Sequence, residues 1–182
     1  MKILFLDHDG VICLSDNWGS RFKKQRSWGK VVGVPLQEIP VEYRFDNFDR
    51  KSVGVLNEIL KCTGCEIVVI SDWRVHCTLE EMGEFYSNQG IIKKPIGFTR
   101  LIHEFDESSA ALYTWKGWKE RARIVEIRDY LERNKVTSWV AVDDMNMNEM
   151  ENFVQTKLSR EGIKQCGIKE KIIRILNYEN KS

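Results

Sequence analysis

Two aspartates near the start of the sequence, Asp7 and Asp9, have the type and spacing that metal-dependent chemistry requires. They stand two residues apart after the apolar run 2–6, so both side chains can face one pocket, and Gly10 lets the backbone turn there. Carboxylates that are crowded together repel one another, and a divalent cation relieves that repulsion. Oxygen ligands suit Mg²⁺, which also binds phosphate oxygens. One carboxylate can then act as a nucleophile while the other serves as general acid and base.

A single pair of this kind is most often a solvated turn or a helix cap, but two further polar strand ends accompany it. Ser71-Asp72 and Asp143-Asp144 each follow directly after a short, β-branched apolar run. In an open α/β sheet, ligands bind at the carboxyl ends of the strands. The three polar strand ends therefore converge on one crevice, where the sequence predicts an active site.

The rest of the sequence alternates short apolar runs with amphipathic segments. This pattern is typical of a doubly wound α/β fold, with a mainly parallel sheet flanked by helices. Asp49 is placed as a helix N-cap, and Thr78 and Glu81 as a capping box. The stretch at about 15–48 is interpreted as an irregular insertion with one short helix, and 100–117 has no clear pattern. The expected strands are 2–6, 66–71, 91–99 and 138–142, and the expected helices are 49–62, 78–88, 118–134, 146–151 and 168–178.

The composition predicts a single domain over 1–182, with the small insertion included. The 28 basic and 27 acidic residues give a formal net charge of +1, so there is no global attraction to nucleic acid or to an anionic membrane. No apolar run approaches the roughly 20 residues that span a bilayer, and the apolar N-terminus is too short for a secretory signal. Five scattered cysteines favour a reducing compartment, and we expect a cytoplasmic protein without a membrane partner. Cys62-Thr63-Gly64-Cys65 lacks the partners of a zinc site and is interpreted as a turn.

Three motifs, in order along the chain, resemble those of the haloacid dehalogenase-like (HAD) hydrolase superfamily. They imply a HAD-like Rossmannoid fold with only a small cap insertion. Two further segments are similar to the HAD domains associated with RNA-repair proteins, in which a Ser-x-Trp-Arg sequence follows the second motif and an Arg-x-x-Glu-Ile sequence opens a later helix. The superfamily motifs are Phe5-Leu6-Asp7-His8-Asp9-Gly10-Val11, Val68-Val69-Ile70-Ser71 and Val140-Ala141-Val142-Asp143-Asp144, and the narrower pair is Ser71-Asp72-Trp73-Arg74 and Arg123-Ile124-Val125-Glu126-Ile127.

The resemblance implies a role for each matching residue. Asp7 would attack phosphorus and form an aspartyl-phosphate, and Asp9 would protonate the leaving group and then activate water. A halide leaving group needs no proton, so the presence of Asp9 favours hydrolysis of a phosphate ester over dehalogenation. The implied Mg²⁺ ligands are the Asp7 carboxylate, the Asp9 backbone carbonyl, Asp143 and Asp144. The Ser71 hydroxyl and the backbone N–H groups beside it, including that of Asp72, would bind the phosphoryl oxygens.

The superfamily also needs a cation to neutralise the phosphoryl group in the transition state, and three residues are candidates: Lys116, Lys119 and Arg123. We favour Arg123 because it lies beside the apolar stripe of its helix, with Lys119 next. Arg74 either binds phosphate bidentately or forms an ion pair at the surface. Trp73 is interpreted as a packing residue, with stacking on the substrate as the alternative. His8 is given no catalytic role because strand alternation turns it away from the two acids.

A minimal cap leaves the crevice open, which favours a large or terminal phosphate as substrate. We expect a nucleotide or the terminal phosphate of a polynucleotide, and the oligomeric state is left open. Phosphoprotein and small-metabolite phosphatases are alternatives, as are a catalytically silent HAD-like binding domain and a phosphorylated receiver domain. The aromatic and basic residues of the insertion have two interpretations. Either they contact bases and phosphates, or the tryptophans pack locally and the charged side chains are solvated. These residues are Trp18, Arg21, Lys23, Lys24, Arg26 and Trp28.

Overall fold

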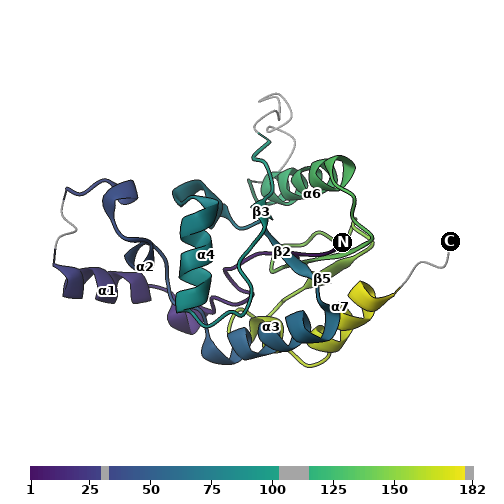
Figure 1. Ribbon diagram of the computed structural model, residues 1–182, viewed down its shortest axis with the longest axis horizontal. Helices are drawn as coiled ribbons and strands as arrows, with labels where there is room; N and C mark the ends of the chain where they lie inside the picture. Colours follow the sequence, from purple (N-terminus) through teal and green to yellow (C-terminus); the bar gives the residue numbers. More distant parts are fainter. Residues whose placement is uncertain (30–32, 103–114, 179–182) are drawn as a thin grey trace.

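The computed structural model describes residues 1–29, 33–102 and 115–178, and it has a parallel sheet at its centre (Figure 1). The five strands lie in the order β3-β2-β1-β4-β5, and every neighbouring pair is parallel. This arrangement confirms the predicted doubly wound α/β fold. The strands are β1 (Lys2–Leu6), β2 (Glu66–Val69), β3 (Gly97–Phe98), β4 (Ser138–Asp143) and β5 (Phe153–Gln155).

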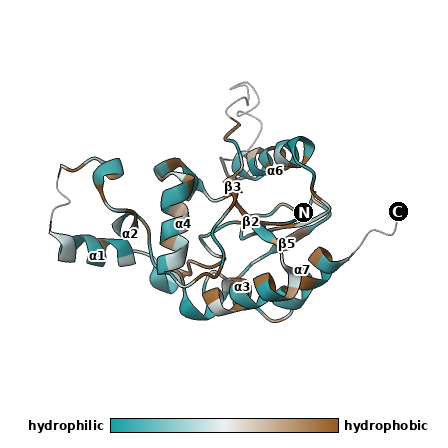
Figure 2. Ribbon diagram, viewed as in Figure 1, coloured by the Kyte–Doolittle hydropathy of each residue, from teal (hydrophilic) through white to brown (hydrophobic). Residues whose placement is uncertain are grey.

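Helices cover both faces of the sheet. Helices α3 (Arg50–Thr63) and α7 (Ile168–Asn177) lie side by side on one face, whereas α6 (Trp115–Arg133) lies on the other (Figure 1). Helix α4 (Leu79–Asn88) follows β2 in the chain and contacts the insertion. In Figure 2, α3 and α7 carry both hydrophilic and hydrophobic residues, as expected for helices that lie between a sheet and solvent.

The central strands are buried on both faces, which explains their continuous apolar sequences. Along β1, Leu4 and Leu6 pack into the core shared with α3 and α7, whereas Ile3 and Phe5 pack into the core beneath α6. Ile124 and Ile127 of α6 belong to this second core, as their helical spacing predicts. No helix among the described residues is long and apolar enough to cross a membrane.

The order of the strands creates a switch point at the centre of the sheet. The chain runs from β1 outward through β2 to β3, and then returns to place β4 on the opposite side of β1. In register, Leu6 of β1 pairs with Val142 of β4. The residues that follow these two strands therefore emerge together at the position where open α/β sheets bind ligands.

Two predicted helix starts are confirmed by their hydrogen bonds. The Asp49 carboxylate accepts from the Ser52 N–H at 2.8 Å, which makes Asp49 the N-cap of α3. Thr78 and Glu81 form the reciprocal capping box of α4. A cap satisfies backbone N–H groups that have no partner within the helix, and each is worth about 1 kcal/mol.

The insertion contains more helix than the sequence predicted. Besides α1 (Ser20–Trp28), it contains α2 (Val41–Arg44) and the 3₁₀ turns η1 (Ser15–Asn17) and η2 (Leu36–Glu38). Contacts between residues far apart in the sequence hold these short elements in place. Lys24 Nζ donates to the Phe45 carbonyl at 2.9 Å, and Arg44 pairs with Glu81 at 2.7 Å. Figure 1 shows α1 and α2 at one side of the molecule, away from the C-terminal helix α7.

Two predictions about elements were wrong, and one strand was missed. The strand expected over 91–99 is only Gly97–Phe98, and Pro95 just before it has no N–H to give to a ladder. No helix forms over 146–151, because Asn146 Oδ1 accepts from the Asn148 N–H in a turn that competes with helical bonding. Strand β5, only three residues long, was missed because so short a segment has no readable period.

Candidate active site

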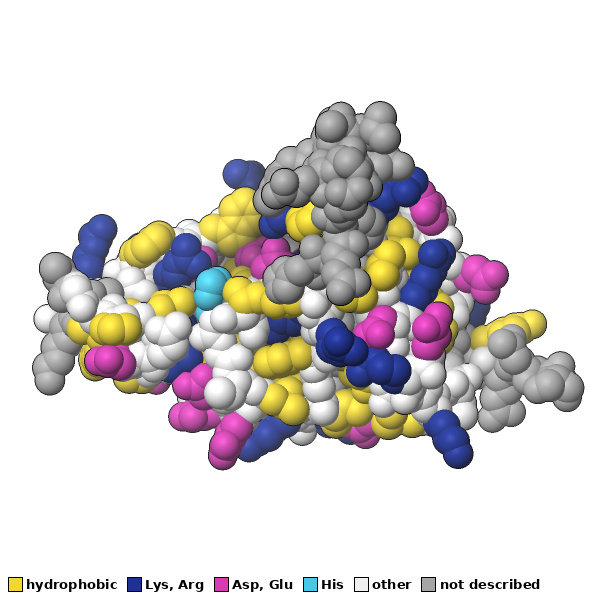
Figure 3. Space-filling model, turned by 90° about the horizontal axis from the view of Figure 1, so that it is seen from above, with side chains coloured by type: hydrophobic (Ala, Val, Ile, Leu, Met, Phe, Trp, Pro, Cys, Tyr) yellow, Lys and Arg dark blue, Asp and Glu magenta, His cyan; other side chains and the backbone are white. Residues whose placement is uncertain are grey.

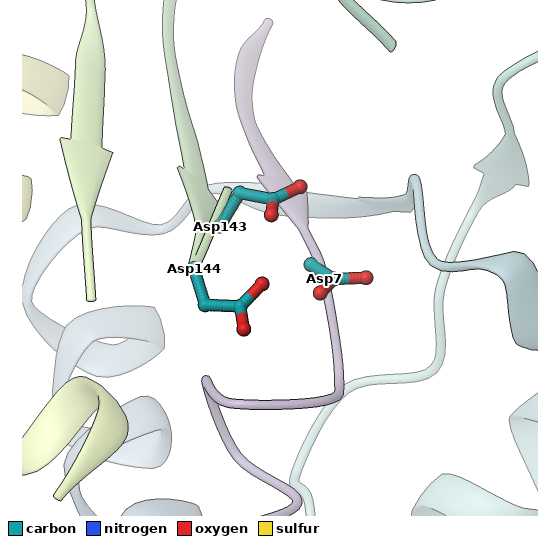
Figure 4. A group of neighbouring side chains, drawn as sticks. All are labelled: Asp7, Asp143 and Asp144. Carbon is teal, nitrogen blue, oxygen red and sulfur yellow. The ribbon is translucent and has the colours of Figure 1, made fainter. Parts of the chain in front are cut away.

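Three aspartates from β1 and β4 meet at the switch point. Asp7 follows β1, Asp143 ends β4 and Asp144 comes next, and all three offer carboxylate oxygens within 4.8 Å of one another. Figure 4 shows the three carboxylates around a common space between the two strand ends. The Asp7 N–H donates to the Val142 carbonyl at 3.0 Å, so strand pairing itself fixes the position of Asp7. The structure thus brings together three of the four residues predicted to bind metal.

The turn after β1 is shaped so that Asp144 can approach it. Gly10 has a φ of +70°, and a Cβ at this position would lie 2.6 Å from Asp144 Oδ2. The His8 carbonyl accepts three successive N–H groups, from residues 11–13, and the Thr156 hydroxyl donates to the Gly10 carbonyl at 3.0 Å. Only glycine fits both this conformation and this space.

Burial and repulsion from neighbouring carboxylates raise the pKa of both Asp7 and Asp144. Burial raises the pKa of Asp7 well above its usual range, and the adjacent Asp143 raises it further, against Arg123, which lowers it. Burial and Asp143 also raise the pKa of Asp144, to about 6. A divalent cation stabilises all three carboxylates in the charged form. Because the donors are all oxygens, the set fits a hard cation such as Mg²⁺.

Arg123 reaches the three acids from helix α6, which covers the face of the sheet opposite α3 and α7. Its Nη1 lies 3.0 Å from Asp7 Oδ1 and 2.8 Å from Asp143 Oδ2, and its Nη2 lies 3.0 Å from Asp72 Oδ1. Lys119 pairs instead with Asp72 at 3.1 Å, at the exposed rim. Of the cations considered from the sequence, Arg123 therefore contacts the acid cluster directly, and the side chain of Lys116 lies outside the described residues.

The Asp9 side chain stands apart from the cluster of Asp7, Asp143 and Asp144. Its Oδ2 accepts a hydrogen bond of 2.8 Å from the indole Nε1 of Trp73. Burial raises the pKa of Asp9, whereas hydrogen bonds from Trp73 and from the Cys13 thiol lower it. A half-buried carboxylic acid with a raised pKa suits a general acid.

The short 3₁₀ turn η3 (Asp72–His76), which follows β2, contains the remaining predicted residues. Ser71 caps it, with its hydroxyl accepting the Trp73 N–H at 3.4 Å. Asp72 is half-exposed, and although partial burial acts in the opposite direction, Arg123 and Lys119 lower its pKa.

Arg74 does not face open solvent. Its Nη2 donates to Glu126 Oε2 at 2.6 Å and its Nη1 donates to the Ile70 carbonyl, with the whole side chain buried. Of the two alternatives considered from the sequence, the structure places Arg74 in an ion pair, but a buried one rather than one at the surface.

Sequence reasoning missed two partners in this region. The role of Glu126 as partner of Arg74 had only a weak signal, its position three residues after Arg123 on one face of α6. Trp73 was expected to pack, and it does stack on Phe45, but its bond to Asp9 joins residues 64 apart in the chain.

His8 lies fully buried against Trp73, and its Nε2 is 2.7 Å from the Tyr86 hydroxyl. Burial lowers the pKa of His8 to about 3, so this imidazole is neutral.

The comparison with protein families agrees with this geometry. The family model of the HAD domain in Swiss Army Knife RNA repair proteins matches residues 3–165, which is most of the chain. The chain belongs to this HAD family. The resemblance inferred from the motifs is thereby confirmed, and the superfamily consists generally of hydrolases. No curated protein and no solved structure gives a significant match to this HAD domain.

Two cavities near this HAD domain's surface differ in chemistry. One of about 450 Å³ lies between the insertion and the core, and its lining includes Arg21, Phe22, Asp72 and Trp73. The other, of about 520 Å³, lies at the opposite end of the sheet, and Glu151 is the one carboxylate among the described residues that line it. The first cavity adjoins the Asp9 partner Trp73, so it is the better placed to receive a substrate.

Proposed function

We propose that this HAD domain is a Mg²⁺-dependent phosphomonoester hydrolase. The observation that carries the proposal is the meeting of Asp7, Asp143 and Asp144 at the switch point, with Asp9 held two residues beyond Asp7. Mg²⁺, bound by the Asp7, Asp143 and Asp144 carboxylates and the Asp9 backbone carbonyl, would supply positive charge for the phosphoryl oxygens.

The protein's own residues account for the two chemical steps. An Asp7 oxygen attacks phosphorus and forms an aspartyl-phosphate, while Asp9 gives its proton to the departing ester oxygen. Asp9, now ionised, then accepts a proton from the water that hydrolyses the aspartyl-phosphate. Arg123, already paired with Asp7, orients the nucleophile and neutralises charge on the phosphoryl group. The Ser71 hydroxyl and the N–H groups at the start of η3 bind the phosphoryl oxygens.

The proposed substrate is a nucleotide or the terminal phosphate of a polynucleotide. The support is the cavity beside Trp73, where the Arg21 guanidinium lies 4.9 Å from the centre of the half-exposed Phe22 ring. Aromatic and cationic groups of this kind hold bases and phosphates. Not every basic residue of the insertion contributes, since Lys24 bonds inward to the carbonyls of Glu42 and Phe45. Figure 3 shows Lys and Arg side chains interspersed with acidic ones on the visible face, which favours a local site over a broad basic surface.

We also propose a cytoplasmic location. All five cysteines are free, which fits a reducing compartment.

The test is turnover of an aryl phosphate with and without Mg²⁺, followed by a panel of nucleotides, 3′- and 5′-phosphorylated oligonucleotides, phosphopeptides and sugar phosphates. Asp7→Asn should reduce turnover to background, because the amide is not a nucleophile. Asp16→Asn, the same change at an exposed residue of η1, is the matched control and should leave turnover unchanged. A purified, folded protein that hydrolyses no member of the panel would refute the proposal, and preference for small sugar phosphates would refute the substrate class.

A further inference from the structure

The indole of Trp73 connects the insertion to Asp9. Its Nε1 donates to Asp9 Oδ2 at 2.8 Å, and its ring stacks with Phe45 at 4.7 Å and with Phe48 at 5.6 Å between centroids. Both phenylalanines belong to the last part of the insertion, just before α3. The ring is almost completely buried, so packing fixes the direction of its N–H.

The direction of this hydrogen bond determines where an acid proton resides on Asp9. In a carboxylic acid, the carbonyl oxygen is a better acceptor than the hydroxyl oxygen, so an oxygen that accepts an N–H remains the carbonyl oxygen. The indole N–H is a stronger donor than the Cys13 thiol, which also bonds Asp9, so donation to Oδ2 favours the proton of the acid form on Oδ1. The same bond becomes stronger when Asp9 ionises, because its acceptor is then charged.

We propose that Trp73 is a positioning residue for general-acid catalysis by Asp9, which rests on the hydrolase function proposed above. As the bond from Asp7 to phosphorus forms and the bond from phosphorus to the ester oxygen breaks, the proton on Asp9 Oδ1 moves to that oxygen. Asp9 is left as a carboxylate that accepts the Trp73 N–H. Trp73 itself exchanges no proton.

The insertion takes part in this positioning through its aromatic residues. The Phe45 carbonyl is anchored by Lys24 Nζ at 2.9 Å, and Asp46 accepts the Arg21 N–H at 2.7 Å. These bonds join α1 to the segment that stacks on Trp73. Trp73 also lines the cavity of about 450 Å³ beside the insertion, so one side chain contacts both the site proposed for the leaving group and the general acid.

Trp73→Phe tests the proposal because it keeps an aromatic ring and removes the N–H. The readout is kcat/KM, which covers the steps through transfer of the phosphoryl group to Asp7, for an aryl and an alkyl phosphate. An alkoxide needs a proton to leave, whereas an acidic phenol does not. We expect a loss of about 10- to 100-fold with the alkyl phosphate and less than about 3-fold with the aryl phosphate.

Trp139→Phe is the matched control, since Trp139 packs on Phe5 in the core beneath α6, and it should change neither substrate's kcat/KM. Phe45→Leu keeps the indole N–H but removes one stacked ring, so a smaller loss selective for the alkyl phosphate is expected. This variant decides the question if Trp73→Phe does not fold.

Equal losses on both substrates, or no loss on either, would overturn the positioning role of Trp73. Failure of the proposed function has a different signature. In that case the unmodified protein hydrolyses neither phosphate, or Asp9→Asn retains full activity on the alkyl phosphate.

Discussion

Replacing Arg74 by methionine should destabilise the protein strongly, because it removes one partner of a buried ion pair. The Arg74 and Glu126 side chains are 3% and 6% exposed, and the atoms that join them are 2.6 Å apart. Methionine fills much of the same space without charge, so the main effect is a Glu126 carboxylate left without its partner. Breaking such a pair costs about 3–5 kcal/mol, a large part of the roughly 5–15 kcal/mol that stabilises an ordinary domain.

The measurement is urea unfolding followed by circular dichroism, or a thermal melt, where this loss corresponds to a Tm lower by about 10 °C. The loss should depend on pH with a defined sign. Burial already raises the pKa of Glu126, although Arg74 and Arg123 lower it, and removing Arg74 raises it further. The folded variant then binds more protons than the unfolded chain above the ordinary glutamate pKa of about 4.3, so its stability falls as pH rises from there through the folded-state pKa.

A second substitution separates the ion pair from other effects. Arg74→Met with Glu126→Leu removes both charges and should recover much of the stability lost in the single variant, because no buried charge remains unpaired. A single variant within about 1 kcal/mol of the unmodified protein would refute the reasoning. Normal stability with a raised KM would instead identify Arg74 as a residue that binds phosphate directly.

Three other outcomes follow from the site geometry. Gly10→Ala should cost about 1–3 kcal/mol, because φ is +70° and the added methyl meets Asp144; thermal melts measure the cost and calorimetry the weakened Mg²⁺ binding. Mg²⁺ should raise the Tm more at pH 7.5 than at pH 5, and a chelator should reverse the gain. This is because the pKa of Asp144 is raised to about 6 by burial and by Asp143, so protons compete with the metal at the lower pH. Arg123→Ala should lower kcat/KM by about 100-fold or more, and Lys119→Ala by less than about 10-fold, since Arg123 contacts Asp7 directly whereas Lys119 pairs with Asp72 at the rim.

The acidic cluster was predictable from the sequence because its position depends on strand ends alone. A buried parallel strand is a short apolar run, and the residue after it lies at the carboxyl edge of the sheet whatever the other details. This rule alone was enough to predict where Asp7 and Asp143 lie. The caps at Asp49 and Thr78 were likewise predictable, because a cap is made between residues three positions apart.

Contacts between residues far apart in the chain were beyond sequence reasoning. Arg74 and Glu126 are 52 residues apart and Trp73 and Asp9 are 64 apart, and no local pattern indicates which partner a buried polar group will find. The helices of the insertion were underestimated for the same reason, since short helices are marginal by themselves and Arg44 and Lys24 hold them by bonds to other segments.

The turn after β2 explains how one short segment can serve several parts of the site. A 3₁₀ turn advances three residues per revolution, so successive side chains point about 120° apart. Asp72 accordingly pairs with Arg123, Trp73 bonds Asp9, and Arg74 pairs with Glu126. An α-helical turn would rotate each residue by only about 100° and would lengthen the segment's hydrogen bonds by one residue, which would move these three side chains out of register with their partners. The geometry of this turn, and not the residue types alone, therefore places Asp72 against Arg123, which contacts Asp7, and Trp73 against Asp9.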